Sequence, residues 1–371
     1  MIPRLLTHEI NRVWNTPKAI IILGPRQVGK TTLIQKLLEG KEYLFLNGDD
    51  QSTVNFMQQA DTQSLKRIIG NYRFVFVDEA QKINGIGNTL KIITDQFRDV
   101  KLLVSGSSSL AMNQATQESL TGRKFEFELF PISWPEYEKH EGQLTGEAAL
   151  EHRLVFGMYP DVISFPHHEK MTLKSLSQSY LYQDILALTG IRKPEMLHRL
   201  LTALALQVGN EVSYNELAQL LQIDKGTILK YIDLLEQSYI VFTLSSYSRN
   251  LRNEIKNNRK VYFYDNGIRN AILDNYSPFE LRTDKGALWE NFLISERKKR
   301  NAYASHYCNS YFWRTQAQQE VDYIEIADGN MSAFEFKWKQ HKKVRFPSNL
   351  ITEYQPITQV VDRNNFREFI F

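Results

Sequence analysis

A phosphate-binding loop is the strongest chemical signal in this chain of 371 residues. The loop has the spacing G-x4-G-K-[ST] plus one more threonine, and it comprises Gly24, Pro25, Arg26, Gln27, Val28, Gly29, Lys30, Thr31 and Thr32. An apolar run precedes it at 19–23 and a helix is expected at 31–38, which is the context that the motif requires. Lys30 is expected to reach the β- and γ-phosphates of a nucleotide and Thr31 to hold Mg²⁺, whereas Arg26 ranks below Lys30 as a phosphate contact.

Two acids follow a second apolar run. Residues 73–79 read Arg-Phe-Val-Phe-Val-Asp-Glu, so Asp78 and Glu79 stand where a buried strand should end. Asp78 can bind Mg²⁺ through its water shell, and Glu79 can polarise the attacking water. An acid pair after a strand would also suit a helix N-cap, but beside a phosphate loop the ATPase interpretation is favoured.

Two more side chains are candidates for the same reaction. Ser107, in the run Ser-Gly-Ser-Ser-Ser at 105–109, could contact the γ-phosphate or position the water, and a plain polar loop is the alternative. Arg123 could act as an arginine finger, in cis or from a neighbouring subunit of an oligomer, and a surface ion pair is the alternative. The predicted catalytic set is therefore Lys30, Glu79, Ser107 and Arg123.

Short apolar runs separated by amphipathic stretches must position these groups. They lie at 19–23, 43–47, 74–77, 101–105 and 125–130, and they predict βαβ units with a buried parallel sheet. The run 43–47 is an extra strand between the loop strand and the Asp78 strand. With the glutamate after Asp78, it resembles the additional-strand, catalytic-glutamate division of P-loop NTPases. No Asn-Lys-x-Asp motif is found, so ATP is preferred to GTP.

Residues 213–235 have the pattern of a helix-turn-helix. Ser213 is expected to cap its first helix in a capping box with Glu216, and Leu217, Leu220 and Leu221 are expected to face inward. Strands at 239–247 and 260–264 would form a wing. The wing carries five basic residues that suit the phosphates of DNA, Arg249, Arg252, Lys256, Arg259 and Lys260. Domain packing or protein binding is the alternative for this region.

The C-terminal third holds a second candidate site. Glu290 lies on an expected helix among small and apolar neighbours, Asp322 on a strand, and Glu335 and Lys337 on one face of another strand. These four could bind Mg²⁺ and cut phosphodiesters, with the carboxylates holding the metal and Lys337 stabilising the developing charge. A fold that binds nucleic acid or protein without cutting is the alternative.

Composition limits the remaining classes. Lys and Arg number 45 against 42 Asp and Glu, and this near balance excludes a histone-like protein but not local basic surfaces such as 297–300 and 337–345. The only cysteine, Cys308, excludes an internal disulfide or a cysteine-based zinc site and is expected to be a strand or core thiol. No membrane-spanning run or signal peptide is apparent, so we predict a cytoplasmic protein.

Nearly the whole chain resembles a family of prokaryotic AAA-type ATPases that end in a winged helix and a PD-(D/E)xK nuclease-like domain of unknown function. The resemblance rests on GPRQVGKTT (24–32), FVFVDEAQK (74–82), SGSSS (105–109), LTGR (120–123), FELFPISWPEY (127–137), YLYQDI (180–185), FYDNG (263–267), GALWENF (286–292), EVDYI (320–324) and FEFKW (334–338). The run 156–160 departs from it where a second glycine is expected. The resemblance implies ATP binding and a nuclease-like topology.

These observations predict an α/β protein of four segments: a P-loop ATPase domain (1–135), a helical lid or linker (136–205), a winged helix (206–275) and a restriction-endonuclease-like domain (276–371). The predicted function is Mg²⁺-dependent ATP binding and hydrolysis coupled to DNA binding or processing. The alternative is a regulatory ATP switch that controls protein partners through a silent nuclease-like scaffold.

Overall fold

The computed structural model describes residues 1–106, 120–179, 194–248, 259–315, 317–340 and 344–371, and these form two compact units. The first unit contains residues 3–131 and 237–239, and the second contains 132–236 and 240–371. The division near 131 lies close to the predicted boundary at 135. The boundaries predicted near 205 and 275, in contrast, fall inside the second unit.

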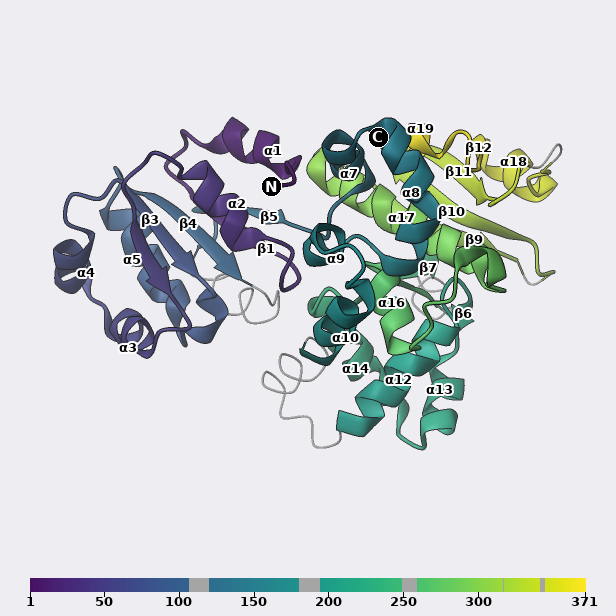
Figure 1. The fold of residues 1–371 in the computed structure, drawn as a ribbon, viewed down its shortest axis with the longest axis horizontal. Coiled ribbons are helices and arrows are strands. Elements are labelled where there is room, and N and C mark those ends of the chain that lie inside the picture. Colours follow the sequence, from purple (N-terminus) through teal and green to yellow (C-terminus); the bar gives the residue numbers. More distant parts are fainter. Residues whose placement is uncertain (107–119, 180–193, 249–258, 316, 341–343) are drawn as a thin grey trace. The chain divides into compact units, whose positions relative to one another are not determined.

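A five-stranded parallel sheet forms the first unit, with the strand order β2-β3-β4-β1-β5 (Figure 1). Its strands are β1 (Ala19–Leu23), β2 (Leu44–Asn47), β3 (Phe74–Asp78), β4 (Lys101–Gly106) and β5 (Lys124–Glu128). All five residues of β1 are buried, as expected for a strand with helices over both faces of its sheet. The predicted parallel α/β architecture is thus confirmed.

Helices surround this sheet. They are α1 (Leu6–Val13), α2 (Lys30–Leu37), α3 (Gln51–Gln59), α4 (Thr62–Ile69), the short 3₁₀ helix η1 (Ala80–Lys82) and α5 (Ile86–Gln96). Local sequence explains where two of them begin: the Asp50 side chain caps α3, and Asp61 forms a capping box with Ser64 at the start of α4.

The extra strand was predicted correctly in the chain but wrongly in the sheet. β2 lies at the edge, and β4 is the strand between β1 and β3. Burial explains the difference. Phe45 of β2 is 43% exposed, as is common at an edge, whereas Leu102, Leu103 and Val104 of β4 are at most 2% exposed.

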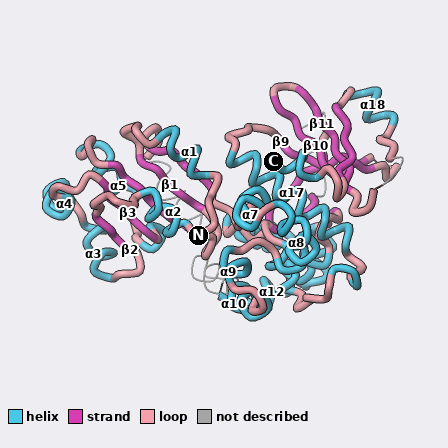
Figure 2. The backbone as a smooth tube through the Cα atoms, turned by 45° about the horizontal axis from the view of Figure 1, so that its top comes forward, coloured by secondary structure: helices cyan, strands magenta, loops and turns pink. Residues whose placement is uncertain are grey.

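A seven-stranded mixed sheet runs through the second unit in the order β12-β11-β10-β9-β7-β8-β6. Figure 2 labels its strands β9, β10 and β11. Its strands are β6 (Glu211–Val212), β7 (Val241–Ser246), β8 (Arg259–Phe263), β9 (Asn309–Arg314), β10 (Glu320–Ala327), β11 (Asn330–Phe336) and β12 (Ile357–Val361). β7 pairs in parallel with β9, so one sheet joins the segments predicted as winged helix and nuclease-like domain. That continuity is why the boundary near 275 separates no compact unit.

The helices of the second unit confirm the helical character expected after residue 135. They are α7 (Trp134–Glu141), α8 (Gln143–Phe156), α9 (Pro160–Ser164), α10 (Glu169–Ser179), α12 (Pro194–Leu206), α13 (Tyr214–Leu221), α14 (Lys225–Gln237), α16 (Asn266–Ile272), the 3₁₀ helix η3 (Phe279–Leu281), α17 (Lys285–Tyr303), α18 (Ser348–Tyr354) and α19 (Phe366–Ile370).

The predicted helix pair at 213–235 forms with one error in its inner face. The Ser213 side chain accepts a hydrogen bond from the Glu216 backbone N–H (3.4 Å) and caps α13, which is one of the two hydrogen bonds of the predicted capping box. Leu217 and Leu221 are buried, but Leu220 is 61% exposed. Residues four apart share a helix face, so the buried stripe of this two-turn helix is narrower than predicted. β7 and β8 pair antiparallel, as expected for the two wing strands.

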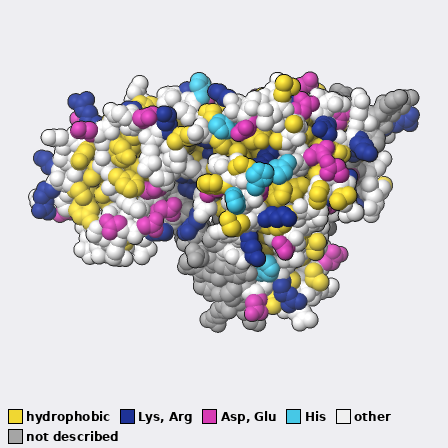
Figure 3. All heavy atoms as spheres, viewed as in Figure 1, with side chains coloured by type: hydrophobic (Ala, Val, Ile, Leu, Met, Phe, Trp, Pro, Cys, Tyr) yellow, Lys and Arg dark blue, Asp and Glu magenta, His cyan; other side chains and the backbone are white. Residues whose placement is uncertain are grey.

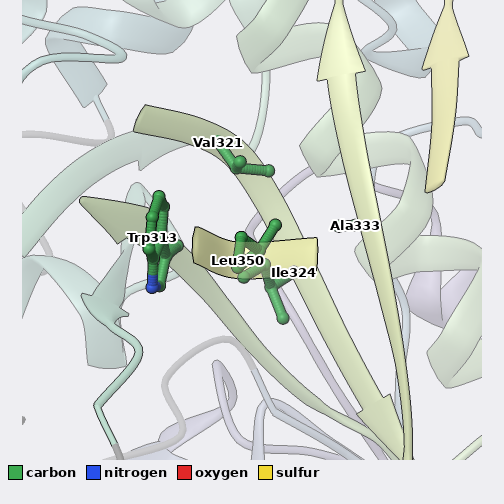
Figure 4. Close-up of a cluster of buried hydrophobic side chains, with 5 residues drawn as sticks. All are labelled: Trp313, Val321, Ile324, Ala333 and Leu350. Carbon is green, nitrogen blue, oxygen red and sulfur yellow. The ribbon is translucent and has the colours of Figure 1, made fainter. Parts of the chain in front are cut away.

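Strands β10 and β11 form the hairpin expected around residues 327–330. Ala327 pairs with Asn330, and the two residues between them, Asp328 and Gly329, have φ angles of 50° and 80°. Positive φ at both positions is the geometry that suits the twist of a two-residue hairpin. Over this hairpin and β9, an apolar cluster packs around α18 (Figure 4); its members are Trp313, Val321, Ile324, Ala333 and Leu350.

Candidate active sites

The phosphate loop connects β1 to α2 through a backbone that only glycine permits at its first position. Gly24 has a φ of 149°, and a Cβ atom there would lie 2.0 Å from the Leu129 carbonyl oxygen. Gly29 (φ 91°) and Gln27 (φ 58°) also lie in the left-handed region. Non-glycine residues rarely adopt that region, so the tight curl of the loop is sustained by its surroundings.

Arg4 supplies part of that support, and sequence reasoning missed it. Its guanidinium donates to the Val28 carbonyl oxygen at 2.6 Å and to the Phe130 carbonyl oxygen at 2.5 Å. One rigid, permanently charged side chain thus connects the middle of the loop to the chain that follows β5. In the sequence, Arg4 is a single arginine near the N-terminus with no motif around it, so nothing there indicates its contact with the loop.

Lys30 and Thr31 begin α2 directly below the loop. Lys30 is 5% exposed, and its ammonium donates to the carbonyl oxygens of Gly24 (2.9 Å) and Pro25 (2.6 Å). The Thr31 hydroxyl donates to Asp78 Oδ2 at 2.9 Å. An ammonium, a hydroxyl and a carboxylate at the N-terminus of a helix fit the phosphates of ATP and a hydrated Mg²⁺ ion.

Asp78 accepts hydrogen bonds from three residues at this end of the sheet. Its Oδ1 atom accepts hydrogen bonds from the Ser105 hydroxyl and from the Glu79 backbone N–H (3.1 Å), while Oδ2 accepts from Thr31. The serine that contacts Asp78 is therefore the last-but-one residue of β4. The predicted Ser107 lies outside the described residues. β4 stands between β1 and β3, so its end had to adjoin both motifs, an inference that required the strand order.

Glu79 lies in a strained turn beside Asp78. Its φ is 50°, an uncommon conformation for a residue with a side chain, and its Oε2 atom accepts a hydrogen bond from Gln81 Nε2 at 2.5 Å. The turn packs against the end of β2, where the Gly48 N–H donates to the Asp78 carbonyl oxygen (2.9 Å). A Cβ atom on Gly48 would lie 2.4 Å from the Glu79 carbonyl oxygen, so this approach needs glycine.

Arg123 lies at the end of the sheet where the parallel strands begin, whereas the phosphate loop lies at the end where they finish. It precedes β5, its carbonyl oxygen accepts from the Ala19 N–H at the start of β1, and its side chain pairs with Asp95 of α5 at 2.6 Å. β1 runs roughly 13 Å from that start to the loop at 3.3 Å per residue. The surface ion pair, one of the two predicted alternatives, is what the structure shows, and the arginine finger in cis does not fit this position.

The four residues of the second candidate site lie together in the second unit. Lys337 Nζ is 2.9 Å from Glu335 Oε2 and 3.9 Å from Asp322 Oδ2. Asp322 Oδ2 also accepts the Phe336 backbone N–H at 2.8 Å, which holds β10 and β11 in register at the site. Burial and the charge of Asp322 raise the pKa of Glu335 to about 6. Burial lowers the pKa of Lys337, but Asp322, Glu335 and Glu290 outweigh that effect, and its pKa rises.

Glu290 joins this group from α17 and brings an unexpected partner. Glu290 Oε1 accepts from the Tyr262 hydroxyl at 2.6 Å and lies 3.2 Å from Lys260 Nζ, which also pairs with Glu320 at 2.5 Å. Burial, then the charge of Asp322, raise the pKa of Glu290 to about 7 despite Lys260. The Glu290 side chain is largely buried, at 15% exposed, and its hydrogen bonds agree with one of the states expected for a carboxylate among small and apolar neighbours.

Lys260 therefore corrects the predicted DNA-binding wing. Its side chain is 2% exposed and sits between two carboxylates, so it offers no surface for DNA phosphates. Arg259 is partly exposed at the start of β8. The other three wing residues, Arg249, Arg252 and Lys256, lie outside the described part of the chain. Burial along β8 explains the error, because every residue of the strand after Arg259 is buried, whichever side of the sheet it faces.

The basic side chains at 297–300 also have partners within the second unit. Arg297 pairs with Glu325, Lys299 (1% exposed) pairs with Glu296 at 2.6 Å, and Arg300 donates to the Phe371 carbonyl oxygen. Lys298 lies over the Phe242 ring, 5.2 Å from its centroid. In the cluster at 337–345, Lys339 and Arg345 are exposed. On the face drawn in Figure 3, Lys and Arg side chains are interspersed with acidic and apolar ones and form no continuous basic band.

The string FYDNG (263–267) contacts the run 156–160, at which the chain departs from the family that it resembles. Asp265 of FYDNG accepts from the Met158 backbone N–H (2.6 Å) and from the N-terminus of α16 at Ile268 (3.1 Å). A Cβ atom on Gly157 would lie 2.1 Å from Asp265 Oδ1, and one on Gly267 2.2 Å from the Phe156 carbonyl oxygen. These strings form a close structural joint within the second unit.

Comparisons with known protein families divide the chain into three parts. Residues 16–138 match the AAA domain, residues 147–278 match a domain of unknown function (DUF8612), and residues 285–367 match another (DUF4143). Together with the parallel sheet and the phosphate loop, the first match supports a P-loop fold of the AAA type for the N-terminal unit. The other two families name no activity.

Relatives extend over most of the chain. An uncharacterized protein of Mycobacterium tuberculosis is 27% identical over 89% of this chain and 72% of its own length. An uncharacterized protein of Methanocaldococcus jannaschii is 23% identical over 85% of this chain and 73% of its own. Among solved structures, a Walker-type ATPase of Pyrococcus abyssi covers 74% of this chain and 96% of its own length, with 14% identity and a TM-score of 0.51, and so shares the fold.

In the parts of the chain that the structure describes, no helix combines the length and the apolarity that a membrane span needs.

Proposed function

We propose that this protein is a Mg²⁺-dependent ATPase whose first unit binds and hydrolyses ATP. The observation that carries the proposal is the convergence of Thr31, Asp78 and Ser105 beneath the phosphate loop. These residues come from α2, β3 and β4, whose ends meet at the carboxyl edge of the sheet. Open parallel sheets bind their ligands at that edge.

The chain's own residues divide the work as follows. The loop N–H groups and Lys30 bind the phosphates, for which Lys30 must leave the carbonyl oxygens of Gly24 and Pro25. Thr31 and Asp78 hold the metal, which when bound neutralises charge on the phosphate oxygens. Glu79 accepts a proton from the attacking water, and Gln81 orients its carboxylate until then.

Metal dependence tests this proposal. Phosphate release from ATP should need Mg²⁺ and should fall at least about 100-fold in Asp78→Asn, because the metal loses a charged partner. Asp95→Asn is the matched control, since it removes an exposed carboxylate from the same unit at the far edge of the sheet. Equal turnover by Asp78→Asn and wild type would refute the site.

A second candidate function belongs to the second unit: divalent-metal-dependent cleavage of phosphodiesters. It is supported by the proximity of Glu290, Asp322, Glu335 and Lys337, a set of three carboxylates and one lysine around which a metal could be held. Carboxylate oxygens would bind Mg²⁺ or Mn²⁺, which supplies an activated water when bound. Lys337 would move from Glu335 to the developing negative charge on the phosphate.

Cleavage assays address this candidate directly. DNA should be cut in the presence of Mn²⁺ or Mg²⁺ by the wild type and by Glu353→Ala, an exposed acid on α18. Glu335→Ala should lose the activity. If Glu335→Ala cuts DNA at the wild-type rate, the activity does not arise at this site. If the wild type cuts nothing, the regulatory switch with a silent scaffold becomes the better account.

We further propose that ATP turnover is coupled to DNA through the second unit. The order of α12, β6, α13, α14, β7 and β8 is that of a winged helix, which supports a DNA-binding role. Binding should weaken steeply from low to moderate salt, because phosphate contacts release counterions. ATP turnover that is indifferent to DNA at low salt would favour protein partners instead.

A further inference from the structure

Three side chains of different donor type, none of them a member of either site described above, lie together in the second unit. They are His306 and Cys308, in the connection from α17 to β9, and Glu325 on β10. Their donor atoms all lie within 4.8 Å of one another. We propose that these three residues bind a transition-metal ion of the zinc type.

The distances come close to those of a tetrahedral centre. Cys308 Sγ is 2.8 Å and His306 Nε2 is 3.9 Å from Glu325 Oε1. Bond lengths of about 2.0–2.3 Å to zinc place tetrahedral donors about 3.4–3.6 Å apart. The thiol must therefore move outward and the imidazole inward, each by less than about 1 Å. Both residues lie outside helices and strands, where such shifts are easiest.

The surroundings already hold the carboxylate as a ligand would be held. Arg297 donates to Glu325 Oε2 through Nε at 2.9 Å, so that oxygen is taken and Oε1 faces the thiol. Asn301 Nδ2 donates to Glu325 Oε1 at 2.5 Å and to Cys308 Sγ at 3.1 Å. Hydrogen bonds that fix ligands from behind are the usual support of protein metal sites.

A proton occupies the place that the metal would take. The Cys308 thiol donates a hydrogen bond to Glu325 Oε1. When a divalent ion binds, the S–H bond breaks, a sulfur–metal bond forms and one proton leaves to the solvent. Binding should thus strengthen as the pH rises.

The donor set selects the metal. One sulfur, one nitrogen and one oxygen suit Zn²⁺ or Co²⁺, whereas Mg²⁺ and Ca²⁺ prefer oxygen alone. His306 is 39% exposed, so water can complete the fourth position. The sequence argument excluded a cysteine-based zinc site, because it considered cysteine ligands alone. A mixed set needs only one thiolate.

Cobalt is the probe that isolates this site. The chain has a single cysteine, so any thiolate-to-cobalt charge-transfer absorption reports Cys308 and neither of the other sites. The full chain should develop this absorption at about one Co²⁺ per chain and lose it when Zn²⁺ is added. Titration calorimetry in two buffers of different ionisation enthalpy should detect the released proton.

Variants test the contribution of each ligand. Cys308→Ser should abolish the band, and His306→Ala and Glu325→Gln should each weaken Co²⁺ binding at least about tenfold. His140→Ala is the matched control, since His140 also lies near a glutamate, 3.7 Å from Glu141, but far from any thiol in the sequence. Circular dichroism of each variant checks its fold. The proposal is overturned if the wild type shows no band with excess Co²⁺, or if folded His306→Ala and Glu325→Gln bind like wild type.

Discussion

The phosphate loop and the acidic site differ in how the chain builds them. The loop site draws its phosphate-binding groups from nine consecutive residues, and Asp78, Glu79 and Ser105 join them from the ends of two strands in the same sheet. The acidic site draws Lys260, Glu290, Asp322, Glu335 and Lys337 from β8, α17, β10, β11 and the residue just after β11.

They also differ in how charge is balanced. In the first site Lys30 contacts backbone carbonyl oxygens, and an incoming phosphate offers it a full negative charge. In the second, Lys260 and Lys337 already lie against carboxylates, so a metal must compete with two ammonium groups. The first site is arranged for an anion, whereas the second must rearrange before it accepts a cation.

The largest effect that would test this comparison is expected at Glu79. Glu79→Gln keeps the size of the side chain but removes the base, so ATP turnover should fall about 10²–10⁴-fold while ATP binding is retained. Turnover by phosphate release and binding by calorimetry measure the two separately. A variant that turns over ATP normally would show that water is activated elsewhere.

A smaller effect is expected from the buried lysine of the acidic site. Lys260→Met should destabilise the second unit by about 3–5 kcal/mol, because Glu290 and Glu320 lose a buried partner. Lys339→Met removes an exposed lysine and should change stability by at most about 0.5 kcal/mol. Chemical denaturation measures both. If Lys260→Met is as stable as the wild type, Lys260 is not held by these buried ion pairs and is again a candidate DNA contact.

The smallest effect is a pH dependence. The pKa of Glu290 is raised to about 7, so the folded state keeps a proton that the unfolded chain releases near pH 4.5. The contribution of Glu290 to the free energy of unfolding is thus present below about pH 4.5 and lost as the pH rises towards about 7, at up to about 1.4 kcal/mol per pH unit.

Glu290→Gln removes this titration. The difference in unfolding free energy between wild type and Glu290→Gln should therefore decrease as the pH rises through that window and stay constant above it. Glu195→Gln, which changes an exposed acid, should leave the pH profile as it is. A difference that does not vary with pH would mean that the Glu290 carboxyl is charged throughout.

Much of the first unit could be predicted because its signals are local. All five strands were expected within one or two residues, and the loop motif specifies a backbone conformation along with its residues. The strand order could not be read in the same way, since it depends on which strand packs at the centre. That gap explains why Ser105 was missed and why Arg123, adjacent in sequence to a strand that neighbours β1, was offered as a finger.

In the second unit, the residue types predicted which side chains form the acidic site, but they did not predict which side chains are exposed. The acids and Lys337 were expected to converge and do so. Lys260 and the run 297–300 were misjudged because charge in a sequence does not reveal burial, and long basic side chains often cover apolar or acidic partners inside a fold. Arg4 and Gly48 had no local signal at all, because their roles depend on contacts with distant backbone.

Calorimetric titration of Mg²⁺-ATP into the full chain and into Lys30→Ala tests the central claim most directly. The account predicts saturable binding of about one ATP per chain to the wild type and a loss of affinity of at least about 100-fold in the variant, because the buried ammonium is the main positive side chain at the loop. Equal affinities, with both proteins folded, would contradict it.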